Sequence, residues 1–174
     1  MATILYLGLE GVCFARKCDL RYISKVDRGT GCRDPLPLIR TIAAVANAQP
    51  ELSFVLNSCL VQDLGYRHII NSLPIEIAAK TVGATMLGNR VHRRPNTVTR
   101  VDALRGDIRR RNPANLLIVD ASQTAIPYEW LDHAIHIDSK AQRDPVATLQ
   151  RILTFLDSAS ADDGQVRPDH ASEQ

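Results

Sequence analysis

The stretch ILYLGLEGVCF, residues 4–14, decides how the rest of the chain is interpreted. Its apolar run, which begins at Thr3 and ends at Leu7, leads directly into Gly8, the pattern of a short buried strand that stops at a turn. Glu10 and Gly11 follow within that turn. Because ligands of parallel sheets bind just beyond the ends of the strands, this turn is the first candidate site.

Length and composition favour one domain. The chain has 174 residues, of which 45% are hydrophobic, enough for one sizeable core and too short for two comfortable domains. We therefore expect an α/β domain over residues 1–157. The segment 158–174 contains one valine and no other branched apolar or aromatic residue, so it cannot offset its ordering entropy, and we expect a disordered tail there.

Composition also limits location and partners. The N-terminus lacks the basic region and small-residue cleavage site of a secretory signal, and no window approaches the roughly 18 apolar residues of a membrane span. We expect a cytoplasmic protein with no membrane partner. The net charge of +2 is too small to indicate a polyanion partner by itself. The four cysteines contain no CxxC pair, so we expect reduced thiols rather than a zinc site.

Short apolar runs alternate with amphipathic stretches along the chain. Residues 15–33 mix charge with glycine and predict a long loop. Further strands are predicted at 53–56, 116–119 and 134–137, while 75–82 is ambiguous between helix and strand and is expected to end at Gly83. Helices are predicted from Asp34-Pro35 to about 48, through 69–70, from Asn96 or Thr97 to about 111, and from Pro145 onward. This alternation indicates a Rossmann-like three-layer sandwich with a mainly parallel central sheet.

Three groups of residues follow the apolar runs and should meet at one edge of this sheet: Gly8 to Gly11, Asn57-Ser58 and Asp120. Each group alone has an ordinary structural explanation. The glycines suit a turn, Ser58 suits a helix N-cap, and Asp120 suits an Asx turn. Their joint placement at three strand ends indicates a functional crevice.

The segments ILYLGLEGV, FVLNS and LLIVD, in that order, resemble motifs one, two and four of the haloacid dehalogenase-like (HAD) superfamily. The run SLPIEIAAKTVGAT is similar to small stand-alone HAD domains grouped with RNA repair proteins. The likeness covers residues 3–138 and implies a HAD-like fold without a large cap domain.

The resemblance also implies roles for residues. Family members carry D-x-D-G-V after the first strand; the first carboxylate attacks a phosphoryl group and binds Mg²⁺, and the second is the general acid and base. Gly8 stands in place of that nucleophile and Glu10 in place of the acid/base. Asp120 matches a magnesium ligand, and the aspartate that often follows it is Ala121 here.

The phosphate-binding residues are implied in the same way. Ser58 matches the hydroxyl that holds the transferred phosphoryl group, with Asn57 beside it. Motif three supplies a cation near the start of the helix before the third strand, for which Arg100 is the first choice and Arg94 the second.

Physical chemistry weighs against covalent catalysis. Phosphoryl transfer through an enzyme intermediate needs a nucleophile, and Gly8 has no side chain. Mg²⁺ requires near-octahedral oxygen coordination, for which Asp120 and little else remains, so we expect weak or absent metal binding. Glu10 could act as a general base toward water, although its carboxylate reaches one methylene further than an aspartate.

Two smaller signals each leave alternatives. Arginines are concentrated between Arg90 and Arg111, where they could bind a nucleic acid, although a solvated helix face is favoured. His133 and His136 lie near Asp132 and Asp138, but no third ligand has a supporting spacing, so strand-edge residues are favoured over a metal site.

The expected function is that of a catalytically degenerate, HAD-like pseudoenzyme. It would bind a phosphorylated ligand or a protein partner through a phosphate-sized crevice and need no cofactor. One alternative is a Mg²⁺-dependent phosphate-ester hydrolase that works through Glu10 without a phosphoaspartate. Another is a protein-protein interaction module with a vestigial site.

Overall fold

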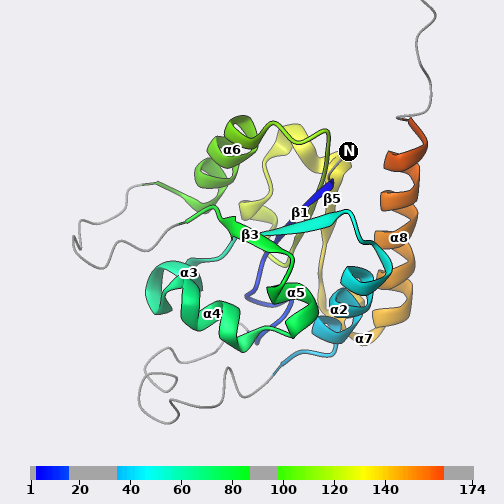
Figure 1. The fold of residues 1–174 in the computed structure, drawn as a ribbon, viewed down its shortest axis with the longest axis horizontal. Helices are drawn as coiled ribbons and strands as arrows, with labels where there is room; N and C mark the ends of the chain where they lie inside the picture. Colours follow the sequence, from blue (N-terminus) through cyan, green and yellow to red (C-terminus); the bar gives the residue numbers. More distant parts are fainter. Residues whose placement is uncertain (1–2, 16–34, 87–97, 163–174) are drawn as a thin grey trace, which may run out of the picture.

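A computed structural model of the chain describes residues 3–15, 35–86 and 98–162 (Figure 1). Five strands form one sheet in the order β3-β2-β1-β4-β5, and every neighbouring pair is parallel. Their bounds are β1 (Thr3–Leu7), β2 (Leu52–Leu56), β3 (Thr81–Ala84), β4 (Asn115–Asp120) and β5 (Ala134–His136). The predicted α/β fold with a mainly parallel sheet is confirmed, and its strand order is Rossmann-like.

Helices connect the strands. They are α2 (Leu38–Ala48), α3 (Cys59–Leu64), α4 (Tyr66–Ser72), α5 (Ile75–Ala78), α6 (Arg100–Arg111), α7 (Ser139–Arg143) and α8 (Pro145–Asp162), with 3₁₀ turns η1 (Gln123–Ala125) and η2 (Tyr128–His133). None of the helices in the described ranges combines the length and the apolar character needed to cross a lipid bilayer.

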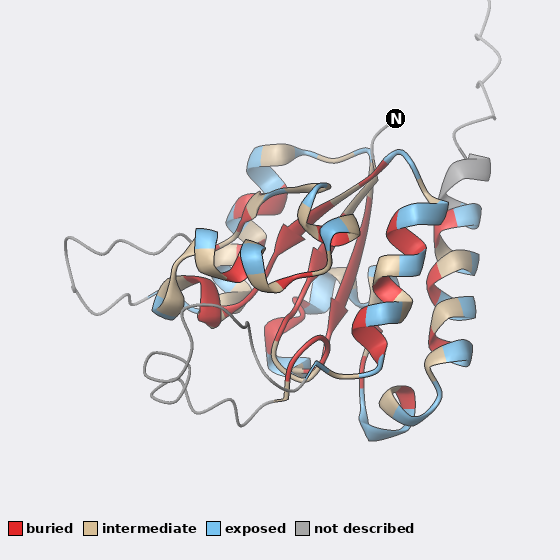
Figure 2. Cartoon of the chain, turned by 60° about the horizontal axis from the view of Figure 1, so that its bottom comes forward, coloured by how far each residue is buried: buried red, intermediate tan, exposed pale blue. Residues whose placement is uncertain are grey.

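One apolar core lies on each face of the sheet, between the sheet and the helices that cover it. The fold therefore has three layers, helices, sheet and helices (Figure 2). Leu5 and Leu7 of β1 belong to the core that α2 and α8 cover, whereas Tyr6 belongs to the core under Leu104 and Ile108 of α6. Successive side chains of a strand point to opposite faces, so the central strand is buried on both sides and must be apolar throughout. Each buried leucine contributes about 2 kcal/mol relative to an exposed one.

The first predicted helix begins later than expected. Asp34-Pro35 was predicted to start it, but α2 begins at Leu38. Leu36 N donates to the carbonyl of Cys13 at 2.9 Å, and Pro35 forms a bridge with Phe14. Long-range pairing with the loop after β1 therefore holds this segment out of the helix.

The start of α6 also differs from the prediction. Its N-cap is Thr99, whose hydroxyl accepts from Asp102 N at 3.2 Å, while Asn96 and Thr97 lie outside the described residues. The predicted end is confirmed, since α6 stops at Arg111 and Asn112 adopts a left-handed conformation with φ of 43°.

The ambiguous segment 75–82 contains both elements, because α5 ends at Ala78 and β3 begins at Thr81. The prediction that Gly83 ends this segment is wrong, since Gly83 lies inside β3. Its φ is +156°, and a β-carbon there would lie 2.7 Å from Nη2 of Arg111. A glycine inside the strand thus makes room for an arginine from α6.

The predicted end of the domain and the predicted loop after β1 lie partly outside the residues that the structure describes. Helix α8 extends to Asp162, past the expected domain boundary at residue 157, and residues 163–174 lie outside the described part. The predicted loop at 15–33 also lies outside it, apart from Ala15.

Lys80 joins the sheet to the end of α2. Its ammonium group donates to the carbonyl oxygens of Ala46 at 2.6 Å, Gln49 at 2.7 Å and Pro50 at 3.3 Å. The last turn of α2 has no basic residue of its own. A lysine from before β3 therefore supplies the positive charge that favours a helix C-terminus.

Candidate functional site

The strand ends singled out from the sequence meet at one edge of the sheet. Gly8 follows the central strand β1, Asn57 follows β2, and Asp120 ends β4. Gly8 N donates to the carbonyl of Val119 and Asn57 N to that of Leu7, each at 2.8 Å, so the strand ladders fix these positions. Strands β2 and β3 lie on one side of β1, and the later strands β4 and β5 lie on the other side. The strand order therefore reverses between β1 and β4, and ligands of such sheets bind at that point.

Gly8 and Asp120 are in direct contact. A β-carbon at position 8 would lie 2.4 Å from Oδ2 and 2.6 Å from Cγ of Asp120, closer than real contacts of that kind. Asp120 is fully buried. The carboxylate of Asp120 thus fills the space that any side chain at position 8 would need, and only glycine permits this approach.

Arg100 links two of the strand ends. Its Nη2 donates to the carbonyl oxygen of Asn57 at 2.8 Å and to Oδ2 of Asp120, with which it forms an ion pair. The other carboxylate oxygen, Oδ1, accepts from Ser122 N at 2.8 Å, so the Asx turn suggested by the sequence is present. Both oxygens of Asp120 are therefore engaged within the protein.

The surroundings of Asp120 raise the pKa of its carboxyl group. Burial raises the pKa of Asp120 to about 6, while the charge of Arg100 and the N–H of Ser122 lower it and the charge of Glu10 raises it. Burial outweighs the ion pair because the carboxylate has lost its contact with water. Asp120 is mostly ionised at pH 7 and takes up a proton in mildly acidic solution.

Ser58 and Glu10 share one backbone donor. Ser58 is the N-cap of α3, and its Oγ accepts from Leu60 N at 3.1 Å. Oε1 of Glu10 accepts from the same N–H at 3.4 Å. The helix-cap explanation for Ser58 is confirmed, and this cap places its fully buried hydroxyl beside the Glu10 carboxylate.

Three buried polar atoms at this edge have no hydrogen-bond partner within the described chain: Oε2 of Glu10, Nδ2 of Asn57 and Nε of Arg100. The Asn57 amide is oriented by Thr85, whose hydroxyl donates to Oδ1 at 2.9 Å. Leaving a buried polar group unsatisfied costs about 1–3 kcal/mol. Two donors and one acceptor at this edge are thus candidates for contact with a water molecule or a polar ligand.

Cys59, directly after Ser58, is half-buried. Burial first, and then the charge of Glu10, raise the pKa of its thiol. The thiolate that nucleophilic chemistry requires is therefore disfavoured at neutral pH.

The residues present do not fit the Mg²⁺ site that the resemblance implies. Within residues 3–15, 35–86 and 98–162 no group of three or more His, Cys, Asp or Glu side chains could hold a metal. Asp120 is already paired with Arg100, whose charge repels a cation, and Ala121 offers no side-chain oxygen. The single unpartnered oxygen of Glu10 falls short of the coordination that Mg²⁺ needs.

Most of the described arginines of α6 have acidic partners. Arg105 donates to both carboxylate oxygens of Glu129, at 2.6 and 3.0 Å, and its guanidinium lies 5.7 Å from the ring centre of Tyr128. Arg110 and Arg111 both pair with the buried Asp107. Arg100 is the arginine of this helix that reaches the strand-end cluster. Arg90, Arg93 and Arg94 lie outside the described residues.

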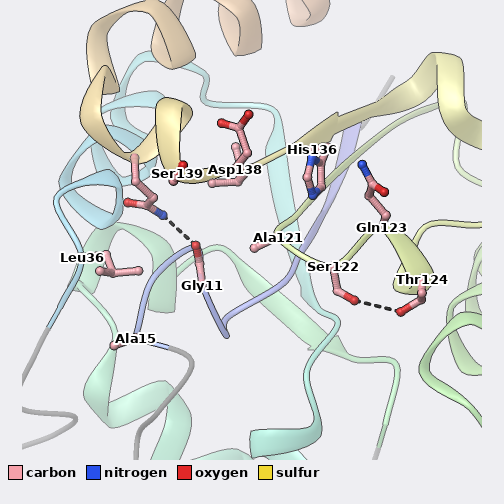
Figure 3. Close-up of a pocket in the computed structure, with 12 residues that line it drawn as sticks. Gly11, Ala15, Leu36, Ala121, Ser122, Gln123, Thr124, His136, Asp138 and Ser139 are labelled. Carbon is pink, nitrogen blue, oxygen red and sulfur yellow. Dashed lines mark hydrogen bonds between the residues drawn. The ribbon is translucent and has the colours of Figure 1, made fainter.

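The two histidines that the sequence suggested as metal ligands, His133 and His136, lie in different surroundings. The ring of His133 packs edge-on against Phe155, with 5.9 Å between the centres. His136 ends β5 and lines a cavity together with Asp138 (Figure 3).

This cavity has a volume of about 730 Å³ and opens beyond the ends of β4 and β5. One part of its lining, residues 121–124, follows β4 directly, and another runs from His136, the last residue of β5, to Ser139. Gln142 holds the loop after β1 against it, donating to the carbonyls of Gly11 at 2.7 Å and Val12 at 3.2 Å. Sequence analysis missed the hydroxyl residues of this lining, although their position just after strand ends was a usable signal.

Comparison with known proteins assigns no family. No protein-family model matches the chain, and neither a curated protein nor a solved structure matches it. The class shown by the structure is thus an α/β protein with a five-stranded, all-parallel sheet.

Proposed function

We propose that the chain is a degenerate HAD-like protein that binds a phosphorylated ligand at the carboxyl edge of its sheet without cleaving it. The observation that carries this proposal is the contact between Gly8 and Asp120. A covalent mechanism needs a nucleophilic side chain at the end of β1, and the carboxylate of Asp120 occupies the space such a side chain would require.

Binding is supported by the donors that remain. Arg100 carries a guanidinium group whose side chain is 16% exposed, and its Nε and the Asn57 Nδ2 have no partner in the described structure. The guanidinium of Arg100, at the start of α6, and the amide of Asn57, after β2, are N–H donors of the kind that suit the oxygens of a phosphoryl group. Asp120 would compete with that group for Arg100, so it limits the affinity.

The first test is a titration with inorganic phosphate and phenyl phosphate, followed by calorimetry and by assay for released phenol. We expect saturable binding without turnover. Arg100→Met should weaken binding about tenfold or more, because a charge-assisted contact is worth about 1.5–3 kcal/mol. The matched control is Arg109→Met, which removes the same charge from an exposed position of α6 and should change affinity little.

The substitution Asp120→Asn should strengthen phosphate binding, whereas Arg100→Met should weaken it. It removes the competing carboxylate charge while keeping nearly the same shape, so phosphate affinity should rise several-fold. If wild type and Asp120→Asn both fail to bind either probe, the proposal is overturned. The interaction module with a vestigial site would then be the better explanation.

The hydrolase alternative has one observation in its favour, the buried and unpartnered Oε2 of Glu10, which could accept a proton from water. It requires phenol release by the wild type that is lost in both Glu10→Gln and Asp120→Asn. Under our proposal all three proteins release no phenol above the buffer rate, with or without Mg²⁺.

A further inference from the structure

The cavity beyond β4 and β5 lacks the positive charge that marks the edge at Arg100. Its described lining contains no lysine or arginine, and Arg100, Asn57 and Asp120 do not belong to it. Its volume of about 730 Å³ lies within the range of about 300–1,000 Å³ that is typical of small-molecule sites. The cavity is therefore large enough for a ligand of its own, which need not reach the edge at Arg100.

The one carboxylate of the described lining is that of Asp138, the residue that caps α7 (Figure 3). Its Oδ1 accepts from Lys140 N at 2.9 Å and from Ala141 N at 2.8 Å, and no other described residue donates a hydrogen bond to Oδ2. The Ala141 N–H is the main cause that lowers the pKa of Asp138, which therefore stays ionised at neutral pH. A negative charge with one free oxygen thus lies at the cavity.

Gln142, which also lines the cavity, supplies a second acceptor. Its Nε2 donates to the carbonyls of Gly11 and Val12, which fixes the orientation of the amide. Its Oε1 is buried and has no hydrogen-bond partner in the described chain. A buried acceptor without a donor is unfavourable, so this oxygen calls for an N–H or O–H from a ligand or a water molecule.

These two acceptors are neighbours in α7. Gln142 N donates to the carbonyl of Asp138 at 3.2 Å, so the two residues lie one helical turn apart on the same side. The hydroxyls of Ser122 and Thr124, which lie 3.0 Å apart in the same lining, each keep a lone pair for a further donor. The polar part of the lining therefore favours a ligand that carries positive charge and several N–H groups.

The apolar part of the lining indicates the rest of that ligand. Leu36, Ala121 and Ile137 supply aliphatic contacts. The described lining contains no phenylalanine, tyrosine or tryptophan, so an aromatic face is not what would hold a cation here. A saturated carbon body that carries an ammonium group meets both parts of the lining, whereas an anion would be repelled by Asp138.

We propose that this cavity binds a small aliphatic primary ammonium ion. Its N–H groups donate to the carboxylate of Asp138 and, directly or through one water molecule, to Oε1 of Gln142. Its carbon body packs against Leu36, Ala121 and Ile137. This inference is independent of the proposed function, because the cavity does not share Arg100, Asn57 or Asp120 with the phosphate-binding edge.

The test compares three probes that share one ring and differ in charge: cyclohexylammonium, cyclohexanol and cyclohexanecarboxylate. The imidazole NMR signals of His136, which lines the cavity, report occupancy and are assigned with the variant His136→Gln. We expect cyclohexylammonium to shift these signals and to bind about fivefold more tightly than cyclohexanol, the gain of one partly exposed ion pair. Cyclohexanecarboxylate should bind more weakly than either.

Asp138→Asn should abolish the advantage of cyclohexylammonium over cyclohexanol, because it removes the charge and keeps a residue that caps a helix well. Asp138→Ser, with another good capping residue, is a second variant that removes the same charge. The matched control is Asp157→Asn, which removes a carboxylate from an exposed position of α8 outside the described lining and should keep the advantage.

Three results would overturn the inference. In the first, the ammonium ion binds no more tightly than the alcohol, or the carboxylate binds most tightly of the three. In the second, the advantage of the ammonium ion survives in the folded Asp138 variants or is lost equally in Asp157→Asn. In the third, no probe shifts the His136 signals.

Discussion

Asp120 and Gly8 approach so closely that the carboxylate of one excludes a side chain on the other, with 2.4 Å between Oδ2 and the place of a β-carbon. The missing side chain at the end of β1 and the buried ion pair of Asp120 with Arg100 are therefore one structural feature. In this arrangement, the ion pair requires a residue without a side chain at position 8.

Gly8→Ala should lower the free energy of unfolding by about 1–3 kcal/mol, because the new methyl group forces Asp120 away from Arg100. Urea denaturation measures the change. Gly106→Ala is the control, since its β-carbon meets nothing within 4 Å and alanine favours the interior of α6, so stability should rise by about 0.5–1 kcal/mol. Equal effects at the two glycines would contradict the contact.

Arg100→Met should cost about 3–5 kcal/mol of stability, because it leaves the carboxylate of Asp120 buried without a compensating charge. Adding Asp120→Asn should restore part of that loss, so the two changes together cost less than the sum of each alone. A double-mutant cycle by chemical denaturation measures the coupling. Strict additivity would show that the pair contributes no interaction.

Stability should depend on pH through Asp120. Its pKa rises from 3.8 to about 6 on folding, mainly through burial, so between these values the folded state holds more protons than the unfolded state. The contribution is fully present below pH 3.8 and is lost as the pH rises toward 6. Relative to Asp120→Asn, the wild type should thus lose stability over this window and remain level above it. Denaturation at several pH values checks this, and a carboxyl signal that titrates below pH 4 in the folded protein would refute it.

Lys80→Met should lower the free energy of unfolding by about 1–3 kcal/mol, because three carbonyl oxygens near the end of α2 lose a charged donor. Thermal and urea unfolding measure the loss. Lys140→Met, at an exposed position of α7, is the matched control and should change stability by less than about 0.5 kcal/mol. If Lys140→Met lowers the free energy of unfolding by as much as Lys80→Met does, the effect comes from removal of a positive charge and not from the contacts of Lys80 with α2.

The central strands were predictable because burial on both faces demands an unbroken apolar run, as in β1 and β4. The end of α6 was predictable because Asn112-Pro113 stops a helix locally. The start of α2 was not, since it depends on the contact of Leu36 with Cys13, and neither was the place of Gly83, which depends on Arg111. Such pairings join distant segments and leave no local pattern.

The candidate site, like the fold, was predictable from the sequence only in part. The sequence predicted that Gly8, Ser58 and Asp120 would share an edge, because strand ends can be read from apolar runs. It also pointed to Arg100 as a nearby cation, but the ion pair with Asp120 depends on the path of one long side chain. The cavity was not predicted, although His136 and Asp138 were considered as metal ligands, because its lining combines segments that follow different strands and meet only in the folded sheet.

The carbonyl of Asn57 and the carboxylate of Asp120 both hold Arg100, across the end of the central strand. An aspartate introduced at position 8 would meet Asp120 and disturb this bridge before it gained any reactivity. A reactive carboxylate at the end of β1 therefore needs at least one further replacement, so packing as well as chemistry limits what that position can hold.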